Sequence, residues 1–240
     1  MMPAAANLTT RIDLKTPLIA LYDAPDRAAF EPLVTPPAGK HTCVFTCYED
    51  WLAGRTLWLT PGNPGCAGGG YWLFGRPGRS RTEFIKFLVD IEGLKASHGL
   101  MDQWLDYHRP YISDHSQLFL GPLRESLYDF VKTITFYVNP DQLSALMLGA
   151  NYHHAPGDPP AVTAPFGSGC MALLPLFEDL NVPQAIIGAT DLAMRSSLPP
   201  DVLAFTVTKP MFARLCGLDE KSFLYKAFLR NLQRARGSGE

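Results

Sequence analysis

The stretch DFVKTITFYVNPDQLSALMLGANY, residues 129–152, decides the fold class. Its first ten residues are rich in β-branched and aromatic side chains, which favours a strand. Asn139 and Pro140 follow, and these residue types are typical of a helix cap and of a first helical position. Apolar side chains then recur at helical spacing and predict a buried helix face, with Leu143, Leu146, Met147 and Ala150.

The same pattern returns near the C-terminus. Residues 201–207 (DVLAFTV) predict a strand, Thr208 is a candidate cap, and apolar residues follow at helical spacing. Placing residues 136–139 over residues 205–208 also aligns two apolar positions of each helix, which indicates an internal repeat. A weaker third copy starts at Pro17.

Repeated strand–turn–helix units predict an α/β fold, with α+β as the alternative. We expect a mixed sheet built from these units, with helices packed on it. The chain is expected to form a single domain over residues 1–236, which the repeat would divide into halves at about 15–125 and 126–236. Residues 237–240 read as a flexible tail or a vector-derived remnant.

The other segments give shorter signals. Strands are predicted at residues 17–22 and 55–60. Ser80 and Glu83 have the spacing of a capping box at a helix start. Residues 107–121 are polar and aromatic and predict a long loop, whereas residues 219–236 predict a final helix with arginines at its end.

Composition excludes several classes of protein. The chain has 240 residues, of which 47% are hydrophobic and 18% charged, and its net charge is −2. The balance of charge gives no basic field for nucleic acid. No run approaches the roughly 18 apolar residues of a membrane span, and no signal peptide is evident, so we expect a cytoplasmic protein that contacts no membrane. Its 21 prolines and its aromatic residues leave room for a homodimer interface.

The chain has five cysteines, at positions 43, 47, 66, 170 and 216. An odd number in a reducing compartment favours metal binding, thiol chemistry or simple burial over structural disulfides. Cys66 lies in PGNPGCAGGG, residues 61–70. Gly68 and Gly69 allow backbone N–H groups to converge on an anion or on the sulfurs of a cluster. The alternative is a tight connection with a buried cysteine.

A second glycine segment holds Cys170, directly after Gly169 and ahead of an apolar helical run. A helix start stabilises a thiolate and suits an anion. Cys43 and Cys47 form a C-x₃-C pair, which would lie about 13 Å apart in a strand and converge only if the segment turns. Cys216 is expected in the core.

The motifs together resemble an uncharacterised family of archaeal and bacterial proteins known as domain of unknown function 169 (DUF169). Three stretches carry the resemblance, together with the segment around Cys170: residues 54–75, 129–152 and 187–212. The family's C-P-G-G appears as Cys66-Ala67-Gly68-Gly69, which lacks the proline. Asp191 and Arg195 match a D-x-x-x-R element. The resemblance implies a shared α/β fold and a redox or metal site made of Cys66, Cys170 and either Cys43 or Cys47.

We hypothesise an iron–sulfur protein, with a [4Fe–4S] cluster held by cysteines 43, 47, 66 and 170. Thiolates suit such clusters, and glycine loops supply N–H donors to their sulfurs. Four cysteines would ligate it fully, whereas three would leave one iron open to a small-molecule substrate, which would make a lyase or other Lewis-acid enzyme possible. A redox role is the other possibility. Zinc on the same thiolates is an alternative cofactor.

Two other hypotheses need no metal. In the first, Cys66 or Cys170 is the nucleophile of an enzyme, and His41, His153 or His154 is its base. His154 is otherwise a helix C-cap or a group that lines the site. In the second, the protein is a non-catalytic module that binds a small anion, with Arg195 or Arg109 as the partner of the anion.

Overall fold

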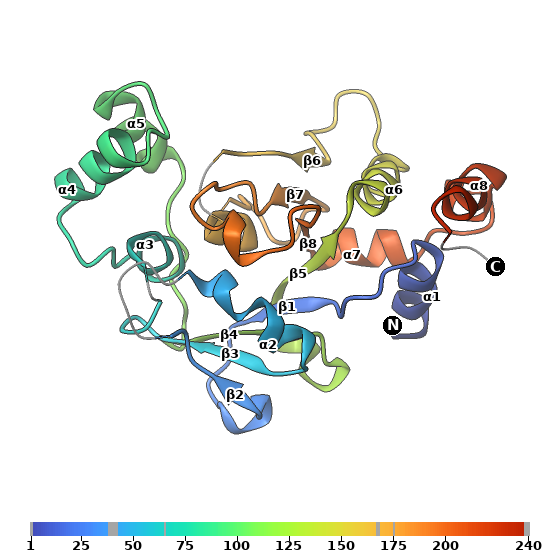
Figure 1. The fold of residues 1–240 in the computed structure, drawn as a ribbon, viewed down its shortest axis with the longest axis horizontal. Helices are drawn as coiled ribbons and strands as arrows, with labels where there is room; N and C mark the ends of the chain where they lie inside the picture. Colours follow the sequence, from blue (N-terminus) through green and yellow to red (C-terminus); the bar gives the residue numbers. More distant parts are fainter. Residues whose placement is uncertain (1, 38–42, 65, 167–168, 175, 238–240) are drawn as a thin grey trace.

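The computed structural model describes residues 2–37, 43–64, 66–166, 169–174 and 176–237. Within them the chain forms one mixed sheet in the order β2-β3-β4-β1-β5-β8-β7-β6 (Figure 1). The expected α/β class with a mixed sheet is therefore confirmed. The strands are β1 (Ile19–Tyr22), β2 (Leu33–Val34), β3 (Thr56–Leu59), β4 (Leu118–Pro122), β5 (Val131–Val138), β6 (Val162–Thr163), β7 (Ala185–Gly188) and β8 (Leu203–Thr208).

The strand order is the same when it is followed outward from the central β1–β5 pair in either direction. Each side continues with its fourth strand, then its third, and ends with its second. The outermost pairs, β2–β3 and β6–β7, are parallel, and all other neighbours in the sheet are antiparallel. The sheet therefore consists of two four-stranded units with matching topology, joined by the antiparallel pairing of β1 with β5.

Several helices begin where the sequence predicts. Asn139 and Gln142 form a capping box at the start of α6, and the hydroxyl of Thr208 accepts the Met211 N–H at the start of α7. Ser80 and Glu83 form the predicted capping box of α4. The α-helices are α1 (Met2–Arg11), α2 (Tyr48–Leu52), α3 (Ala67–Phe74), α4 (Arg81–Lys86), α5 (His98–Tyr107), α6 (Pro140–Asn151), α7 (Lys209–Cys216) and α8 (Ala227–Ala235).

Both faces of the sheet are buried. Side chains alternate across a strand, so Ile19 and Leu21 face one core while Ala20 and Tyr22 face the other. The first core packs against α2, α3 and α5, and the second packs against α1, α6 and α7. In Figure 1, α4 and α5 form an arm at one end of the molecule, and α1 and α8 lie together at the opposite end.

Two local predictions were wrong. Residues 107–121 were expected to be a loop, but Leu118 begins the buried strand β4, whose apolar run is too short to stand out from its polar surroundings. The final helix is interrupted, because Asp219 and Ser222 form a turn ahead of the 3₁₀ segment Phe223–Tyr225. Of the two alternatives for the segment of Cys43 and Cys47, the structure shows the turn, because residues 44–47 form a 3₁₀ turn.

The described part of the chain contains no helix that is long and apolar enough to cross a membrane.

Candidate functional site

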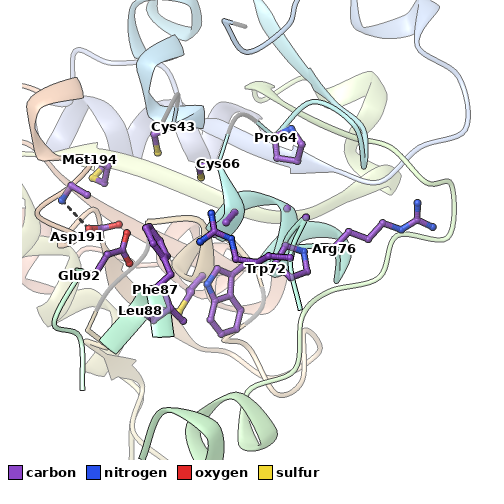
Figure 2. Close-up of a pocket in the computed structure, with 18 of the residues that line it drawn as sticks. Cys43, Pro64, Cys66, Trp72, Arg76, Phe87, Leu88, Glu92, Asp191 and Met194 are labelled. Atoms are coloured by element: carbon purple, nitrogen blue, oxygen red, sulfur yellow. Dashed lines mark hydrogen bonds between the residues drawn. The ribbon is translucent and has the colours of Figure 1, made fainter. Parts of the chain in front are cut away.

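A cavity of about 1180 Å³ lies on the face of the sheet that carries α3. Its walls come from the loop before α3, the π-helical turn Phe87–Ile91, α5, and the segments around residues 43 and 191. Most of the wall is apolar and aromatic, with Trp72, Phe87, Met101, Trp104, Phe166 and Met171. Cys43 and Cys66 point into one end of the cavity, beside Glu92 and Asp191 (Figure 2). We call this the cysteine end.

Cys66 occupies the N-cap position of α3 with an extended backbone. Its sulfur accepts a hydrogen bond from the Gly69 N–H at 3.2 Å and another from the Gly68 N–H. A Cβ at Gly69 would lie 3.1 Å from Pro64 Cβ, so the tight loop favours glycine there. Burial raises the pKa of the Cys66 thiol to about 11, and the two N–H donors only partly oppose this.

Cys43 is the N-cap residue of the 3₁₀ turn Val44–Cys47, but its side chain makes no cap hydrogen bond of the kind that Cys66 makes. The side chain of Cys170 and the N–H groups of Phe45 and Val44 are neighbours of its sulfur that favour the thiolate. The side chain of Cys170 is the main reason that the pKa of Cys43 is lowered, against opposition from burial and from the charge of Asp191.

Cys170 lies behind Cys43, in the 3₁₀ turn Gly169–Leu173, and is only 1% exposed. A Cβ at Gly169 would lie 2.5 Å from the ring of Phe45. Glycine at this position therefore allows the segment of Cys170 to approach the segment of Cys43 closely.

Three groups of the cysteine end, Cys43, Cys66 and Asp191, and the buried Cys170 come from corresponding connections of the two halves. Cys43 follows the edge strand β2, and Cys170 follows the edge strand β6. Cys66 follows β3, and Asp191 follows the corresponding strand β7. Segments that are far apart in the sequence thus meet because the two halves of the sheet have the same topology.

Tyr137, on β5, has a buried hydroxyl without a hydrogen-bond partner among the described residues. The side chain is 1% exposed, and its ring stacks on Trp51 at a centroid distance of 5.7 Å. Cys43 and Cys170 are electrostatic neighbours of this hydroxyl, whose pKa is raised mainly by burial. Buried polar groups normally have partners, so this hydroxyl, like the indole N–H of Trp51, is an exception that calls for an explanation.

Glu92 and Asp191 lie next to one another at the cysteine end (Figure 2). Burial, and then the charge of Asp191, raise the pKa of Glu92 to about 7, although Arg79 opposes them. The sequence analysis did not select Glu92 or Tyr137. Tyr137 is one of several apolar residues of a strand, and Glu92 lies in a turn without a recognisable motif. No local sequence pattern therefore marks either residue as part of a site.

The structure separates Cys43 from Cys47. The segment turns after Cys43, so that Cys43 lines the cavity while Cys47 is buried near Asp50, outside the cavity lining. Burial, and then the charge of Asp50, raise the pKa of Cys47 to about 11. Cys216 lies on α7, against the core of the opposite face.

The remaining predicted residues lie away from the cysteine end. Arg195 donates hydrogen bonds to the carbonyl groups of residues 189, 199, 200 and 202, and therefore holds the loop that follows β7. His154 is exposed, and its Nε2 lies 2.9 Å from the Pro159 carbonyl oxygen. His41 lies outside the described residues. Gly68 lines the cavity with Cys66, whereas Gly169 contacts Phe45.

The described residues contain no group of three or more His, Cys, Asp or Glu side chains placed to hold a single metal ion. A single ion needs its donors to converge on one point. A cluster instead takes its thiolates at separate corners, and backbone N–H groups donate to their sulfurs. Of the three thiols in this region, Cys43 and Cys66 line the cavity and Cys170 is buried outside its lining.

Comparison with known proteins gives one match. The family model for DUF169, described as an uncharacterised ArCR family, matches residues 7–217. No curated protein matches the chain, and no solved structure matches it. The matched range includes every residue of the cysteine end and stops before α8.

Proposed function

Because this chain belongs to the uncharacterised DUF169 family, which brings no activity with it, we propose a function from its site: an iron–sulfur protein that acts on a small molecule. Cys43, Cys66 and Cys170 would hold a [4Fe–4S] cluster at the cysteine end of the cavity. Bound there, such a cluster would supply either an electron-transfer centre or an iron that acts as a Lewis acid toward a substrate in the cavity.

The observation that carries the proposal is the unpartnered hydroxyl of Tyr137. It is buried, has no hydrogen-bond partner within the described residues, and has Tyr48, Cys43 and Cys170 as its electrostatic neighbours. A hydroxyl in that position is satisfied if it donates to a thiolate or to a sulfide. Hydrogen bonds to cluster sulfurs also tune reduction potential, which gives Tyr137 a role beyond packing.

Backbone N–H groups favour the thiolate form of two of the proposed ligands, although burial still raises the pKa of Cys66 to about 11. The N–H groups of Gly68 and Gly69 donate to the sulfur of Cys66, and those of Val44 and Phe45 help to lower the pKa of Cys43. Donors of this kind stabilise negative charge on sulfur without adding a charge of their own. Binding of a metal would neutralise the charge of the Cys66 thiolate and so reduce the free energy that its burial costs.

The substrate side of the cavity carries Glu92 and Asp191. With a pKa of about 7, Glu92 holds or releases a proton near neutral pH and is suited to general acid–base work. The aromatic walls exclude water from the bound molecule. With three cysteine ligands, a cluster held here would keep one iron without a protein thiolate and available to a substrate in the cavity. A redox or lyase reaction on a small molecule in a reducing compartment such as the cytoplasm fits this arrangement.

The test is metal and acid-labile sulfide analysis of protein purified without oxygen, with its visible absorption spectrum. We expect about four iron and four sulfide per chain. Cys43→Ser, Cys66→Ser and Cys170→Ser should each lower the iron content. Cys216→Ser is the matched control on the opposite face, and Cys47→Ser distinguishes the two members of the C-x₃-C pair. Both should keep full iron content. Protein without iron, or loss of iron in Cys47→Ser but not in Cys43→Ser, would contradict the proposal.

One observation favours a cysteine nucleophile as a second candidate, namely the lowered pKa of Cys43. The described residues that line the cavity include no histidine, so Glu92 or Asp191 would have to act as the base. Stoichiometric alkylation of Cys43 near neutral pH in a protein that contains no iron would favour this candidate.

A further inference from the structure

The wall of the cavity at α5 contains aromatic rings that already hold a cation. Trp104, on α5, lies beside Trp72 and Phe166, at ring-centroid distances of 5.3 and 4.8 Å. All three side chains line the cavity. The ammonium nitrogen of Lys95 lies 4.0 Å from the centroid of the Phe166 ring and 5.9 Å from that of the Trp104 ring. We call Trp104 and Phe166 the aromatic subsite.

The hold of the aromatic subsite on Lys95 is weak enough to be replaced. Within the part of the chain that the structure describes, the ammonium of Lys95 makes no hydrogen bond and no ion pair besides its contacts with the two rings. The side chain is half-buried and belongs to the non-helical segment between residues 91 and 98, so it can turn into water without moving a helix. A lysine ammonium is strongly hydrated, which favours that movement.

The chemistry of the rings indicates which ligand would take the place of Lys95. The face of an aromatic ring attracts positive charge through its quadrupole, most strongly where water is excluded. A methylated ammonium group has the same charge as lysine, but methyl groups replace its N–H donors. Entry into an apolar wall therefore leaves fewer donors without a partner.

The charged side chains of the cavity are consistent with a cationic ligand. Glu92 and Asp191 line the cavity, and their carboxylates attract a cation. Of the two arginines in the described lining, Arg76 points away from these carboxyl groups (Figure 2), and Arg79 lies over the ring of Phe87, 4.6 Å from its centroid. The Phe87 ring is thus covered by an arginine of the wall, whereas the aromatic subsite is covered by a lysine that can leave.

We propose that the aromatic subsite binds the methylated or quaternary ammonium group of a small molecule, and that Lys95 occupies the subsite until this molecule enters. Binding of the cation needs no cluster. Only the further step, that the cationic molecule is the substrate of the cysteine end, rests on the proposed function. Because Lys95 competes with the ligand, removal of its ammonium should strengthen binding, and removal of either ring should weaken it.

The experiment titrates full-length protein with choline, with tryptophan fluorescence as the signal, because Trp72 and Trp104 line the cavity. The comparison compound is 3,3-dimethylbutan-1-ol, which has the shape of choline without the charge. We expect choline to bind and the alcohol to bind more weakly. Lys95→Met should bind choline about tenfold more tightly, because a competing cation is removed, and should not favour the alcohol. Trp104→Leu and Phe166→Leu should each lose most of the preference for choline.

Lys209→Met is the matched control, because the ammonium of Lys209 lies 5.3 Å from the ring centroid of Tyr128, a residue that packs against the core of the opposite face. This variant should bind choline as the unchanged protein does. Equal binding of choline and the alcohol overturns the preference for a cation, and choline binding that does not strengthen in Lys95→Met overturns the role of Lys95.

Iron analysis of the same preparations separates this inference from the proposed function. Choline binding by protein that takes up no iron overturns the cluster and leaves the aromatic subsite standing. Protein with full iron content that binds neither compound overturns the aromatic subsite and leaves the cluster standing.

Discussion

Tyr22 and Tyr137 lie on the two central strands of the sheet and bury their hydroxyls on opposite faces, but only the hydroxyl of Tyr22 has partners. It donates to the Pro122 carbonyl at 2.7 Å and accepts the Arg124 N–H at 2.9 Å. The hydroxyl of Tyr137 has no partner within the described residues and lies beside two thiols. The two tyrosines are similarly buried, but removal of the hydroxyl oxygen should change the free energy of unfolding differently at each.

We predict that Tyr137→Phe leaves the metal-free protein as stable as the unchanged protein, or more stable by about 1 kcal/mol. The reason is that removal of an unsatisfied buried hydroxyl removes its desolvation penalty. In protein loaded with a cluster the same variant should lower the reduction potential, because a hydrogen bond to sulfur is lost. Urea unfolding measures the first effect and a potentiometric titration measures the second.

Tyr22→Phe is the matched control. It removes a donor and an acceptor that are both used, so we expect a loss of about 1–2 kcal/mol in the metal-free protein. Its potential in the loaded form should not change, because Tyr22 faces the opposite core. A Tyr137→Phe variant as destabilised as Tyr22→Phe would show that the hydroxyl of Tyr137 has a partner in solution.

The helix that Cys66 caps, α3, depends on close backbone contact at Gly70. A Cβ at Gly70 would lie 2.3 Å from the Arg76 carbonyl oxygen, a backbone atom that cannot rotate away. We expect Gly70→Ala to cost about 2–3 kcal/mol of the free energy of unfolding and to lower cluster content. Gly62→Ala, in the loop before α3, has open space around the added carbon and should change neither quantity. Equal unfolding temperatures of Gly70→Ala and Gly62→Ala would show that the backbone around Gly70 moves to accommodate the added carbon.

Local patterns in the sequence predict the strands and helix starts that rest on short-range chemistry. Asn139, Thr208 and Ser80 each cap a helix as expected, because a cap involves only residues three apart. The strand β4 escapes prediction because its five residues gain their burial from neighbours on β1 and β3, far away in sequence.

The residues of the candidate site also differ in whether a local sequence pattern predicts them. Cys66 and Cys170 have glycines beside them, so the sequence shows that the backbone is special there. The choice of Cys43 over Cys47 depends on a 3₁₀ turn, which the sequence left open against a strand. Tyr137 and Glu92 enter only when the two halves of the sheet are assembled, because their surroundings come from distant segments.

Asp23 anchors the loop that leads into β4. Its buried carboxylate accepts hydrogen bonds from the hydroxyls of Tyr111 and Ser113 at 2.5 and 2.7 Å, and lies 2.9 Å from His115 Nδ1. Burial opposes ionisation, but these hydrogen bonds prevail and lower the pKa of Asp23. We expect Asp23→Asn to cost about 2–3 kcal/mol near neutral pH, as measured by urea unfolding.

A group whose folded pKa is lowered stabilises the fold above its unfolded pKa, which is about 3.9 for aspartate. The contribution of Asp23 should therefore be present at neutral pH and be lost as the pH falls below about 4. The nearby exposed Asp26 makes one hydrogen bond, to the Ala28 N–H, and Asp26→Asn should have little effect. A cost of Asp23→Asn that is unchanged at pH 3 would argue against this account.

Glu92 should show the opposite dependence on pH. Its folded pKa of about 7 lies above its ordinary value of 4.5, because burial and then Asp191 disfavour the carboxylate. Between those two values the folded protein binds a proton that the unfolded chain has released. The free energy of unfolding therefore falls as the pH rises from about 4.5 to about 7.

Glu92→Gln removes this titration. At pH 5 the variant and the unchanged protein should have similar stability. At pH 8 the variant should be more stable by about 1 kcal/mol, a value reduced for the screening that water gives a half-buried carboxyl. Urea unfolding across pH 4.5–8 checks this, with the exposed Glu220→Gln as the control that should follow the unchanged protein at every pH. If the stability of Glu92→Gln also followed that of the unchanged protein at every pH, the pKa of Glu92 would not be raised in the folded protein. Glu92 would then not be a candidate general acid.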